Sequence, residues 1–260
     1  MGELIARKEN AVGWVIFSNP TKFNAVSQDM WMALPKAIAG FDADPEVRLI
    51  VITGAGEKAF ISGADISQFE KARGSADAQA IYNQAVVDAY EAPVRCSKPV
   101  VAKIRGICMG GGLGLAAACD VRFASADSVF RMPAGRLGLG YNYTGINRFT
   151  QIIGAAGTAD IFFSARKFDA ADALRMGFLN RVLPAGDLDR EVAAYCALVA
   201  ENAPLTLAAA KFAIRQTGLD PAARDLAHTA RMIEICFDSE DYREGRRAFM
   251  EKRKPKFQGK

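Results

Sequence analysis

The chain has 260 residues and a mass of 28.0 kDa, with 50% hydrophobic and 24% charged residues, which excludes disordered and collagen-like chains and allows a large buried core. Its formal charge of +4 is uneven, because residues 242–260 contain eight Lys or Arg and two Glu, a net +6, and the rest carries −2. No apolar run approaches the roughly 20 residues that span a bilayer, and the first ten residues lack a secretory signal, so we expect a cytoplasmic protein without a membrane contact.

The first two thirds of the chain alternate strand-like and helix-like segments. Residues 11–18, 47–54 and 99–106 are apolar and β-branched, and each run is followed by a polar or glycine-rich turn and then by a helical pattern. Ser27 is the expected N-cap of the first helix, and Pro35 inside that helix is expected to kink it or delay its start. This alternation predicts an α/β fold.

The last third of the chain is expected to be helical. Asp169 should cap a short helix that Gly177 ends. After about Asn202 the sequence contains three amphipathic segments, residues 204–218, 221–237 and 239–253. Because no strand remains for them to cover, we expect a separate helical layer that contacts another subunit.

Few side chains offer nucleophilic or metal chemistry. The single histidine, His228, argues against a histidine metal site or a Ser/His/Asp triad, and we expect it on a helix surface or interface. The cysteines lack metal or redox spacing, so we predict buried free thiols and no metal site. They are Cys96, Cys108, Cys119, Cys196 and Cys236.

A glycine-rich stretch, residues 106–120, follows the third predicted strand. Within it, Gly112-x-Gly114-x-x-Ala117 formally matches the dinucleotide fingerprint, although the acidic residue expected about 20 residues later is absent. A nucleotide-dependent oxidoreductase is therefore one hypothesis. The other is that the turn leaves free N–H groups at a helix N-terminus, where they can stabilise an oxyanion or enolate.

A second glycine-containing turn, residues 54–66, lies between another predicted strand and a helix that Asp65 could cap. If the two strands are neighbours in one sheet, the two turns can direct two N–H groups at one oxygen. Two donors of this kind form an oxyanion hole.

Four segments carry a family resemblance: NPTKFNAVS from Asn19, AFISGADI from Ala59, SKPVVAKIRGICMGGGLGLAAACDVRFAS from Ser97 and AFMEKRKPKF from Ala248. In order and spacing they resemble the enoyl-CoA hydratase/isomerase, or crotonase, family over about residues 15–257. The resemblance implies a spiral of ββα units with an acyl-CoA site over residues 1–200. It also implies a C-terminal helical trimerisation region over residues 201–260, which would assemble a homotrimer or a hexamer.

The same resemblance implies the ligand and its contacts. Members of the family bind coenzyme A thioesters, so coenzyme A is part of the substrate and no permanently bound cofactor is expected. The N–H groups of Ala64 and Gly111 would hold the thioester oxygen, and the basic C-terminal region fits a polyanionic ligand; no nucleic-acid partner is expected. The contacts carried over for coenzyme A are Lys22, Asn24, Ala64, Asp65, Ile66, Phe249 and Lys252, the last two from this subunit or a neighbouring one.

The sequence departs from the family at the two positions that move protons in its hydratases. Those enzymes have a glutamate three residues after the oxyanion glycine and another just after a later Q-P, and this chain has Gly114 and Ala134 there. Neither side chain can transfer a proton. Ordinary hydration is therefore doubtful, and decarboxylation of a malonyl-type thioester fits better because loss of carbon dioxide forms the enolate without a base.

The run LGLGYN, residues 137–142, resembles a stretch of methylmalonyl-CoA decarboxylases in this family. It makes Tyr141 and Asn142 candidates for polar groups near the reacting carbon, although Gly140 replaces a proline, and Ala64 replaces a histidine found in some of those enzymes. Tyr141 could equally pack a loop. The alternatives are a hydratase or isomerase with other polar groups, and a coenzyme A-binding protein without catalysis.

Overall fold

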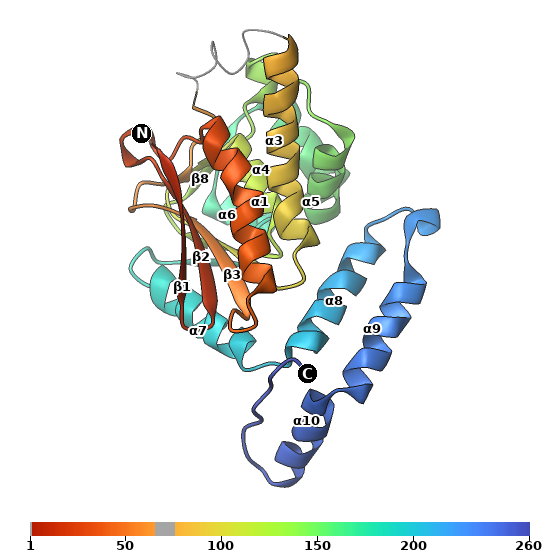
Figure 1. Ribbon diagram of the computed structural model, residues 1–260. Coiled ribbons are helices and arrows are strands. Elements are labelled where there is room, and N and C mark those ends of the chain that lie inside the picture. The colour runs from red at the N-terminus through yellow and green to blue at the C-terminus, as the bar shows by residue number, and fades with distance from the viewer. Residues whose placement is uncertain (1, 66–75) are drawn as a thin grey trace.

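The computed structural model describes residues 2–65 and 76–260, and its strands form two sheets (Figure 1). The larger sheet contains, in spatial order, β1 (Glu3–Glu9), β2 (Val12–Ser18), β3 (Leu49–Gly54), β5 (Val100–Ile104), β7 (Val121–Ser125) and β10 (Arg181–Leu183). The smaller contains β4 (Ala59–Ile61), β6 (Ile107–Met109), β8 (Val129–Arg131) and β9 (Lys167–Asp169). Among these described strands, β1 pairs with β2 and β8 with β9 in antiparallel orientation, and the other pairs are parallel.

Three successive turns of the chain each add one strand to each sheet and then a helix. The pairs β3–β4, β5–β6 and β7–β8 precede α3 (Ala76–Arg95), α4 (Gly111–Ala118) and α5 (Tyr143–Ser164), respectively. The predicted α/β spiral of ββα units is therefore confirmed. Because the larger sheet adds its strands in sequence order, it lacks the reversal at which doubly wound folds bind a dinucleotide, so the oxidoreductase hypothesis loses its support.

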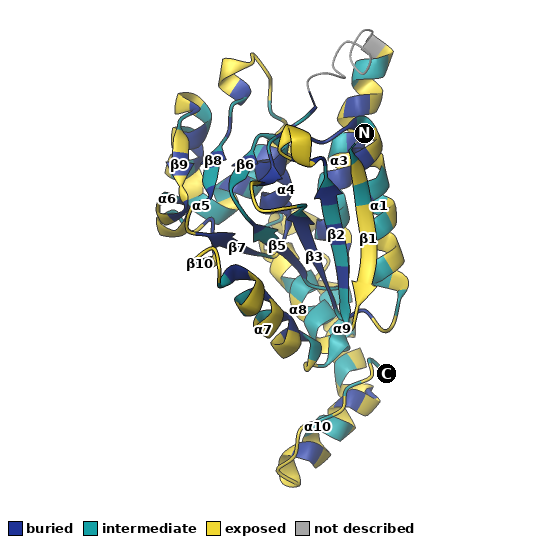
Figure 2. Ribbon diagram, turned by 90° about the vertical axis from the view of Figure 1, so that its left-hand side faces the viewer, coloured by how far each residue is buried: buried dark blue, intermediate teal, exposed yellow. Residues whose placement is uncertain are grey.

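Both faces of the larger sheet are covered. In β3, Ile50 and Ile52 face one buried cluster, whereas Leu49 and Val51 face another that includes side chains of α7 (Leu188–Ala200). Alternate residues of a strand point to opposite faces, so continuous apolar strands indicate a sheet buried on both sides. Figure 2 shows that the central strands of this sheet are buried, whereas the edge strand β1 is exposed.

The helix boundaries follow the expected capping signals. The Ser27 side chain accepts a hydrogen bond from the N–H of Met30 and begins α1 (Gln28–Ala43), so Pro35 does not delay the start of this helix. Asp169 caps α6 (Ala170–Arg175) through the N–H of Asp172, and Gly177 follows with a φ of +81°. Within residues 2–65 and 76–260, the remaining ordered elements are the short 3₁₀ segments η1 (Pro20–Lys22), η3 (Ala134–Arg136) and η4 (Pro221–Ala223).

The three C-terminal helices form as predicted. They are α8 (Pro204–Thr217), α9 (Leu226–Asp238) and α10 (Glu240–Met250), and Figure 1 shows them extending away from the two sheets. No single helix in the described ranges is long and apolar enough to cross a membrane. Only α7 and α8 taken together reach that length, and they are bent by 106°.

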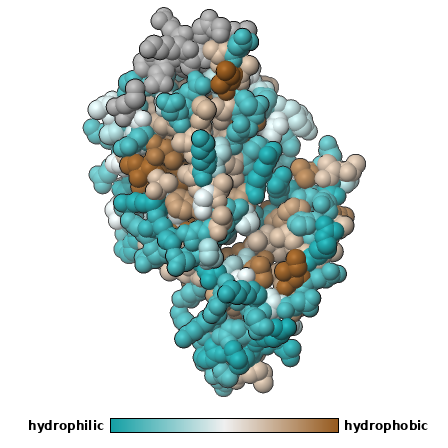
Figure 3. All heavy atoms as spheres, in the orientation of Figure 1, coloured by the Kyte–Doolittle hydropathy of each residue, from teal (hydrophilic) through white to brown (hydrophobic). Residues whose placement is uncertain are grey.

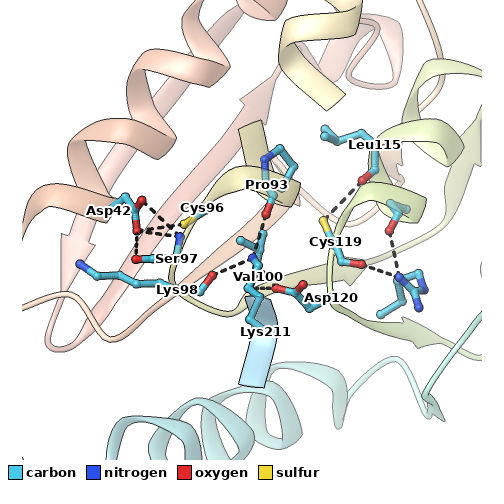
Figure 4. A network of polar contacts seen from close by, with 12 residues as sticks. Asp42, Pro93, Cys96, Ser97, Lys98, Val100, Leu115, Cys119, Asp120 and Lys211 are labelled. Atoms are coloured by element: carbon cyan, nitrogen blue, oxygen red, sulfur yellow. Dashed lines mark hydrogen bonds and ion pairs between the residues drawn. The ribbon is translucent and has the colours of Figure 1, made fainter. Parts of the chain in front are cut away.

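A lysine with a largely covered side chain ties the first of these helices to the body of the fold (Figure 4). Lys211 of α8 donates to the carbonyl oxygens of Pro93 and Lys98, both at 2.8 Å, and to the Asp120 carboxylate at 2.7 Å. Asp120 also accepts from the N–H of Val100 at 2.7 Å, as its expected position in the turn after α4 allows. All three protons of the ammonium group are thus donated in hydrogen bonds that connect α8 to the body of the fold.

Replacing this lysine should destabilise the protein. Lys211→Met removes a cation that is 10% exposed, takes a donor from two carbonyl groups and leaves Asp120 without its opposite charge, so the free energy of unfolding should fall by about 2–4 kcal/mol. Lys254→Met, which breaks an exposed pair with Glu201, is the matched control and should change it by less than about 0.5 kcal/mol. Urea denaturation followed by circular dichroism measures both, and equal effects would contradict the anchoring role.

Candidate active site

The two glycine-containing turns meet at one end of the smaller sheet. Strands β4 and β6 pair in parallel, with Ile61 opposite Cys108, so the loops after them leave the sheet side by side. A Cβ atom added to Gly110 would lie 3.8 Å from the Cα of Gly63. The sequence-based expectation of adjacent turns is met.

The first turn ends in a helix whose N-terminus is open. Gly110 precedes α4 with φ +51° and ψ −116°, a conformation that side-chain-bearing residues rarely adopt. The next residue, Gly111, is the first of the helix, and no described residue accepts a hydrogen bond from its N–H. This N–H therefore combines a free donor with the positive end of the helix dipole.

The second turn is fixed by a bridge to the segment before α1. The N–H of Val26 donates to the Gly63 carbonyl, and the N–H of Asp65 donates to the Val26 carbonyl, both at 2.9 Å. Ala64 lies between these bonds, and its own N–H has no acceptor within the described ranges. Two unused N–H groups, of Ala64 and Gly111, thus belong to adjacent turns.

Two tyrosine hydroxyls occupy the space beside Gly114. A Cβ atom at this position would lie 2.7 Å from the Tyr90 hydroxyl oxygen and 2.8 Å from that of Tyr141. Tyr90, which lies on α3, also donates to the carbonyl of Gly111 at 3.1 Å. Where the resemblance predicts a carboxylate side chain, this chain therefore has phenol groups from two other segments.

Both phenol groups are protonated at neutral pH. Burial raises the pKa of Tyr141 to about 12, although its contact with Tyr90 and the positive charge of Arg148 lower it. Burial likewise raises the pKa of Tyr90 well above its usual value. A protonated phenol donates a proton or a hydrogen bond, but it is not a base.

Packing fixes the ring of Tyr141. Its centroid lies 5.0 Å from that of Phe162 and 6.5 Å from that of Phe149. Gly145 permits this arrangement, because an added Cβ there would meet the tyrosine ring at 2.4 Å. The next residue, Asn142, caps α5 by accepting a hydrogen bond from the N–H of Gly145 at 2.8 Å, so its role at a reacting carbon stays a prediction.

The position of the second expected glutamate lies near the same turns. Pro133 would approach a Cβ at Gly110 to 3.7 Å, and Ala134, the next residue, is buried. The carbonyl of Ala134 accepts from the N–H groups of Leu137 and Leu139. This residue therefore shapes the loop before Tyr141 but contributes no titratable group.

The residues proposed for coenzyme A fall into two groups. Lys22 and Asp65 form an ion pair at 2.9 Å, and the Asn24 side chain is buried and bonded to backbone of residues 19, 55 and 59. Ile66 lies outside the described residues, as does the helix start that Asp65 could cap. Phe249 and Lys252 are exposed at the end of α10, which Figure 1 shows at the far end of the molecule from α4.

The remaining titratable candidates lie elsewhere. His228 is on α9, where its ring packs against Phe212 with centroids 4.7 Å apart. Four cysteines are buried and Cys236 is partly exposed, and none is in a disulfide. Within residues 2–65 and 76–260, no three His, Cys, Asp or Glu side chains converge as a metal site would require.

A buried arginine holds the other end of α4. Arg122 donates to the carbonyls of Ala116 and Cys119 at the C-terminus of this helix and to that of Phe178. A cation there satisfies carbonyl groups that the helix itself leaves free. Arg122 and Tyr90 had no predicted role, since neither belongs to a motif with a local signature.

Comparison with known proteins identifies the family of this chain. The model of the enoyl-CoA hydratase/isomerase family matches residues 7–260. The short-chain-enoyl-CoA hydratase of Clostridium acetobutylicum is 31% identical over 258 residues, which cover 98% of this chain and 97% of that protein. The peroxisomal Delta(3,5)-Delta(2,4)-dienoyl-CoA isomerase of Arabidopsis thaliana is 29% identical over 263 residues, covering 96% and 93%.

Solved structures show the same fold. A putative enoyl-CoA hydratase/isomerase family protein from Hyphomonas neptunium superimposes with a TM-score of 0.93 at 33% identity, covering 99% of this chain and 98% of that one. An enoyl-CoA hydratase/carnithine racemase from Magnetospirillum magneticum gives 0.92 at 32% identity, covering 99% and 96%. The chain belongs to the enoyl-CoA hydratase/isomerase family, which acts on CoA thioesters.

The close packing of the two hydroxyls beside Gly114 can be tested by measuring the stability of variants. Gly114→Ala places a methyl group within 3 Å of both hydroxyls, so the free energy of unfolding should fall by about 1–3 kcal/mol. Gly40→Ala, inside α1 with nothing within 4 Å of the new Cβ, is the control and should raise it by about 0.5–1 kcal/mol. Denaturant melts of both variants are the measurement, and a stabilised Gly114→Ala would refute the packing described.

Proposed function

We propose that this protein transforms an acyl-CoA thioester through an enolate whose oxygen is held by the N–H groups of Ala64 and Gly111. The observation that carries the proposal is the pair of adjacent turns with two unused N–H donors, one of them at the start of α4. Such donors act at the oxygen on which charge develops, and each contributes roughly 3–4 kcal/mol to transition-state stabilisation.

The favoured reaction is decarboxylation of a malonyl-type thioester such as methylmalonyl-CoA. The bond to the carboxylate breaks, carbon dioxide leaves, and the bonding electron pair forms the enolate, so no base is needed. Gly114 and Ala134 cannot act as bases, and Tyr141 is a protonated phenol. We place the Tyr141 hydroxyl beside the departing carboxylate, with Asn142 as a second polar group on the same loop.

Hydration or isomerisation of an enoyl-CoA is the second candidate. It is favoured by the names of the relatives, which include a short-chain-enoyl-CoA hydratase and a dienoyl-CoA isomerase at 29–31% identity. In this reaction the phenol groups would have to orient water in place of two carboxylates. A third outcome is a protein that binds coenzyme A thioesters and does not convert them.

Coenzyme A would be held as part of the substrate. We propose that Lys22, Asn24 and Asp65, together with Ile66, flank it through backbone and charge. Phe249 and Lys252 would reach its nucleotide from a neighbouring subunit, because within one chain they lie far from α4.

We further propose that residues 1–200 form the catalytic spiral and residues 201–260 an oligomerisation region. Figure 3 shows hydrophobic side chains gathered over α8 and α9. The exposed apolar residues of these two helices include Ile214, Leu226, Ile233, Ile235 and Phe237. Exposed apolar surface of this kind fits burial against a second copy. A cytoplasmic homotrimer or hexamer is the assembly that we propose.

The reaction can be assigned by mass spectrometry of the protein incubated with methylmalonyl-CoA and crotonyl-CoA. We expect propionyl-CoA from the first and no gain of water on the second. Water gained on crotonyl-CoA would overturn the decarboxylase assignment in favour of a hydratase. Thioester binding by calorimetry without any product would instead indicate the non-catalytic alternative.

The oxyanion hole can be tested with two substitutions at one residue. Gly111→Pro deletes the N–H, whereas Gly111→Ala keeps it and adds the same Cβ, which in either case approaches Trp31 to 2.9 Å. The proline variant should turn over about 100- to 1,000-fold more slowly than the alanine variant, while part of the thioester binding survives. Equal turnover in the two folded variants would exclude a role for this N–H.

A further inference from the structure

The Tyr90 hydroxyl connects three parts of the candidate site. It belongs to α3, donates to the Gly111 carbonyl in α4 at 3.1 Å, and contacts the Tyr141 hydroxyl from the loop before α5. Both hydroxyls lie within 3 Å of the point that a Cβ of Gly114 would occupy. Because the side chain is absent at Gly114, two separate elements can place their hydroxyls on the same face of α4.

The position of the Tyr90 ring is itself fixed. It meets Trp31 edge-on with centroids 5.7 Å apart, and the Trp31 indole N–H donates to the Tyr82 hydroxyl at 3.2 Å. Trp31 is fully buried. The orientation of the Tyr90 hydroxyl therefore depends on packed aromatic neighbours rather than on solvent.

A phenol has one proton to donate and lone pairs that accept. While Tyr90 donates to the Gly111 carbonyl, its oxygen can accept the Tyr141 proton. If Tyr141 loses its proton, Tyr90 can turn its O–H toward the new phenolate. The same group can thus hold Tyr141 before and after a proton transfer.

We propose that Tyr90 is a positioning residue that holds the Tyr141 hydroxyl beside the α-carbon of the bound thioester and stabilises the Tyr141 phenolate after proton donation. The inference rests on the proposed enolate chemistry. In that step the Tyr141 O–H bond breaks as the Cα–H bond of the product forms, and the phenolate then recovers a proton from water. Burial raises the pKa of Tyr141, and the contact with Tyr90 lowers it by a smaller amount. Tyr90 therefore makes Tyr141 a stronger acid than burial alone would leave it.

The kinetic test compares Tyr90→Phe, Tyr141→Phe and the double variant with methylmalonyl-CoA. We expect Tyr90→Phe to lower kcat about 10- to 100-fold with KM changed by less than about threefold. The double variant should be no slower than Tyr141→Phe, because Tyr90 acts through Tyr141. Tyr195→Phe, on α7 against Phe123, is the control and should keep full turnover.

Three kinetic results would overturn the proposal. They are full kcat in Tyr90→Phe, a change in KM alone, and a double variant whose loss is the product of the two single losses. The last result would mean that the two hydroxyls act independently.

A second measurement does not depend on turnover. Tyrosine labelled with carbon-13 at Cζ gives a resonance for Tyr141, assigned by its loss in Tyr141→Phe, and propionyl-CoA serves as an unreactive probe. In the wild-type protein the probe should move this resonance. In the Tyr90→Phe variant, calorimetry should still detect binding of propionyl-CoA, but the Tyr141 resonance should no longer move.

The two measurements separate the two proposals. A protein that decarboxylates nothing, yet shows the probe-dependent Tyr141 resonance and its loss in Tyr90→Phe, refutes the proposed reaction and supports the positioning role. A Tyr141 resonance that does not respond to bound propionyl-CoA overturns the role of Tyr90, whatever the turnover.

Discussion

The parallel pairing of β4 with β6 is the constraint on which the candidate site depends. It brings the Gly63–Ala64 turn beside the Gly110–Gly111 turn, and neither turn alone could surround an oxygen with two donors. The bridge to Val26 holds the turn that contains Ala64, and the hydrogen bonds of Arg122 hold the C-terminal end of α4. The proposed oxyanion hole therefore depends on strand pairing, and the side chain of Ala64 has little part in it.

Gly114 stands at a position where the family resemblance predicts a carboxylate. A carboxylate on α4 would move with the helix and could accept a proton, whereas the hydroxyls of Tyr90 and Tyr141 come from other elements and are protonated. The polar groups are thus acids in a place where the resemblance predicts a base. This difference in chemistry, rather than any difference in fold, motivates decarboxylation as the reaction.

Local signals predicted much of the fold and part of the site. Ser27 and Asp169 act as caps, the glycine-led helix begins at Gly111, and the last third is helical, because each depends on residues close together in the chain. Tyr90 had no such signal, because it lies in an amphipathic helix 24 residues before Gly114 and 51 before Tyr141. Only tertiary packing brings these three residues together. The bond from Lys211 to Asp120, across 91 residues, was hidden for the same reason.

The strand order of the larger sheet has a consequence for biosynthesis. Each ββα unit finds its partner strands in the unit made just before it, so the spiral can grow in the order in which the ribosome delivers it. The final strand, β10, pairs with β7 and is synthesised only after β9, the last strand of the smaller sheet. Until then β7 is an open edge, the kind of surface that recruits strands from other chains. The last turn of the spiral therefore covers the edge of β7 and leaves the short strand β10 as the edge of the larger sheet.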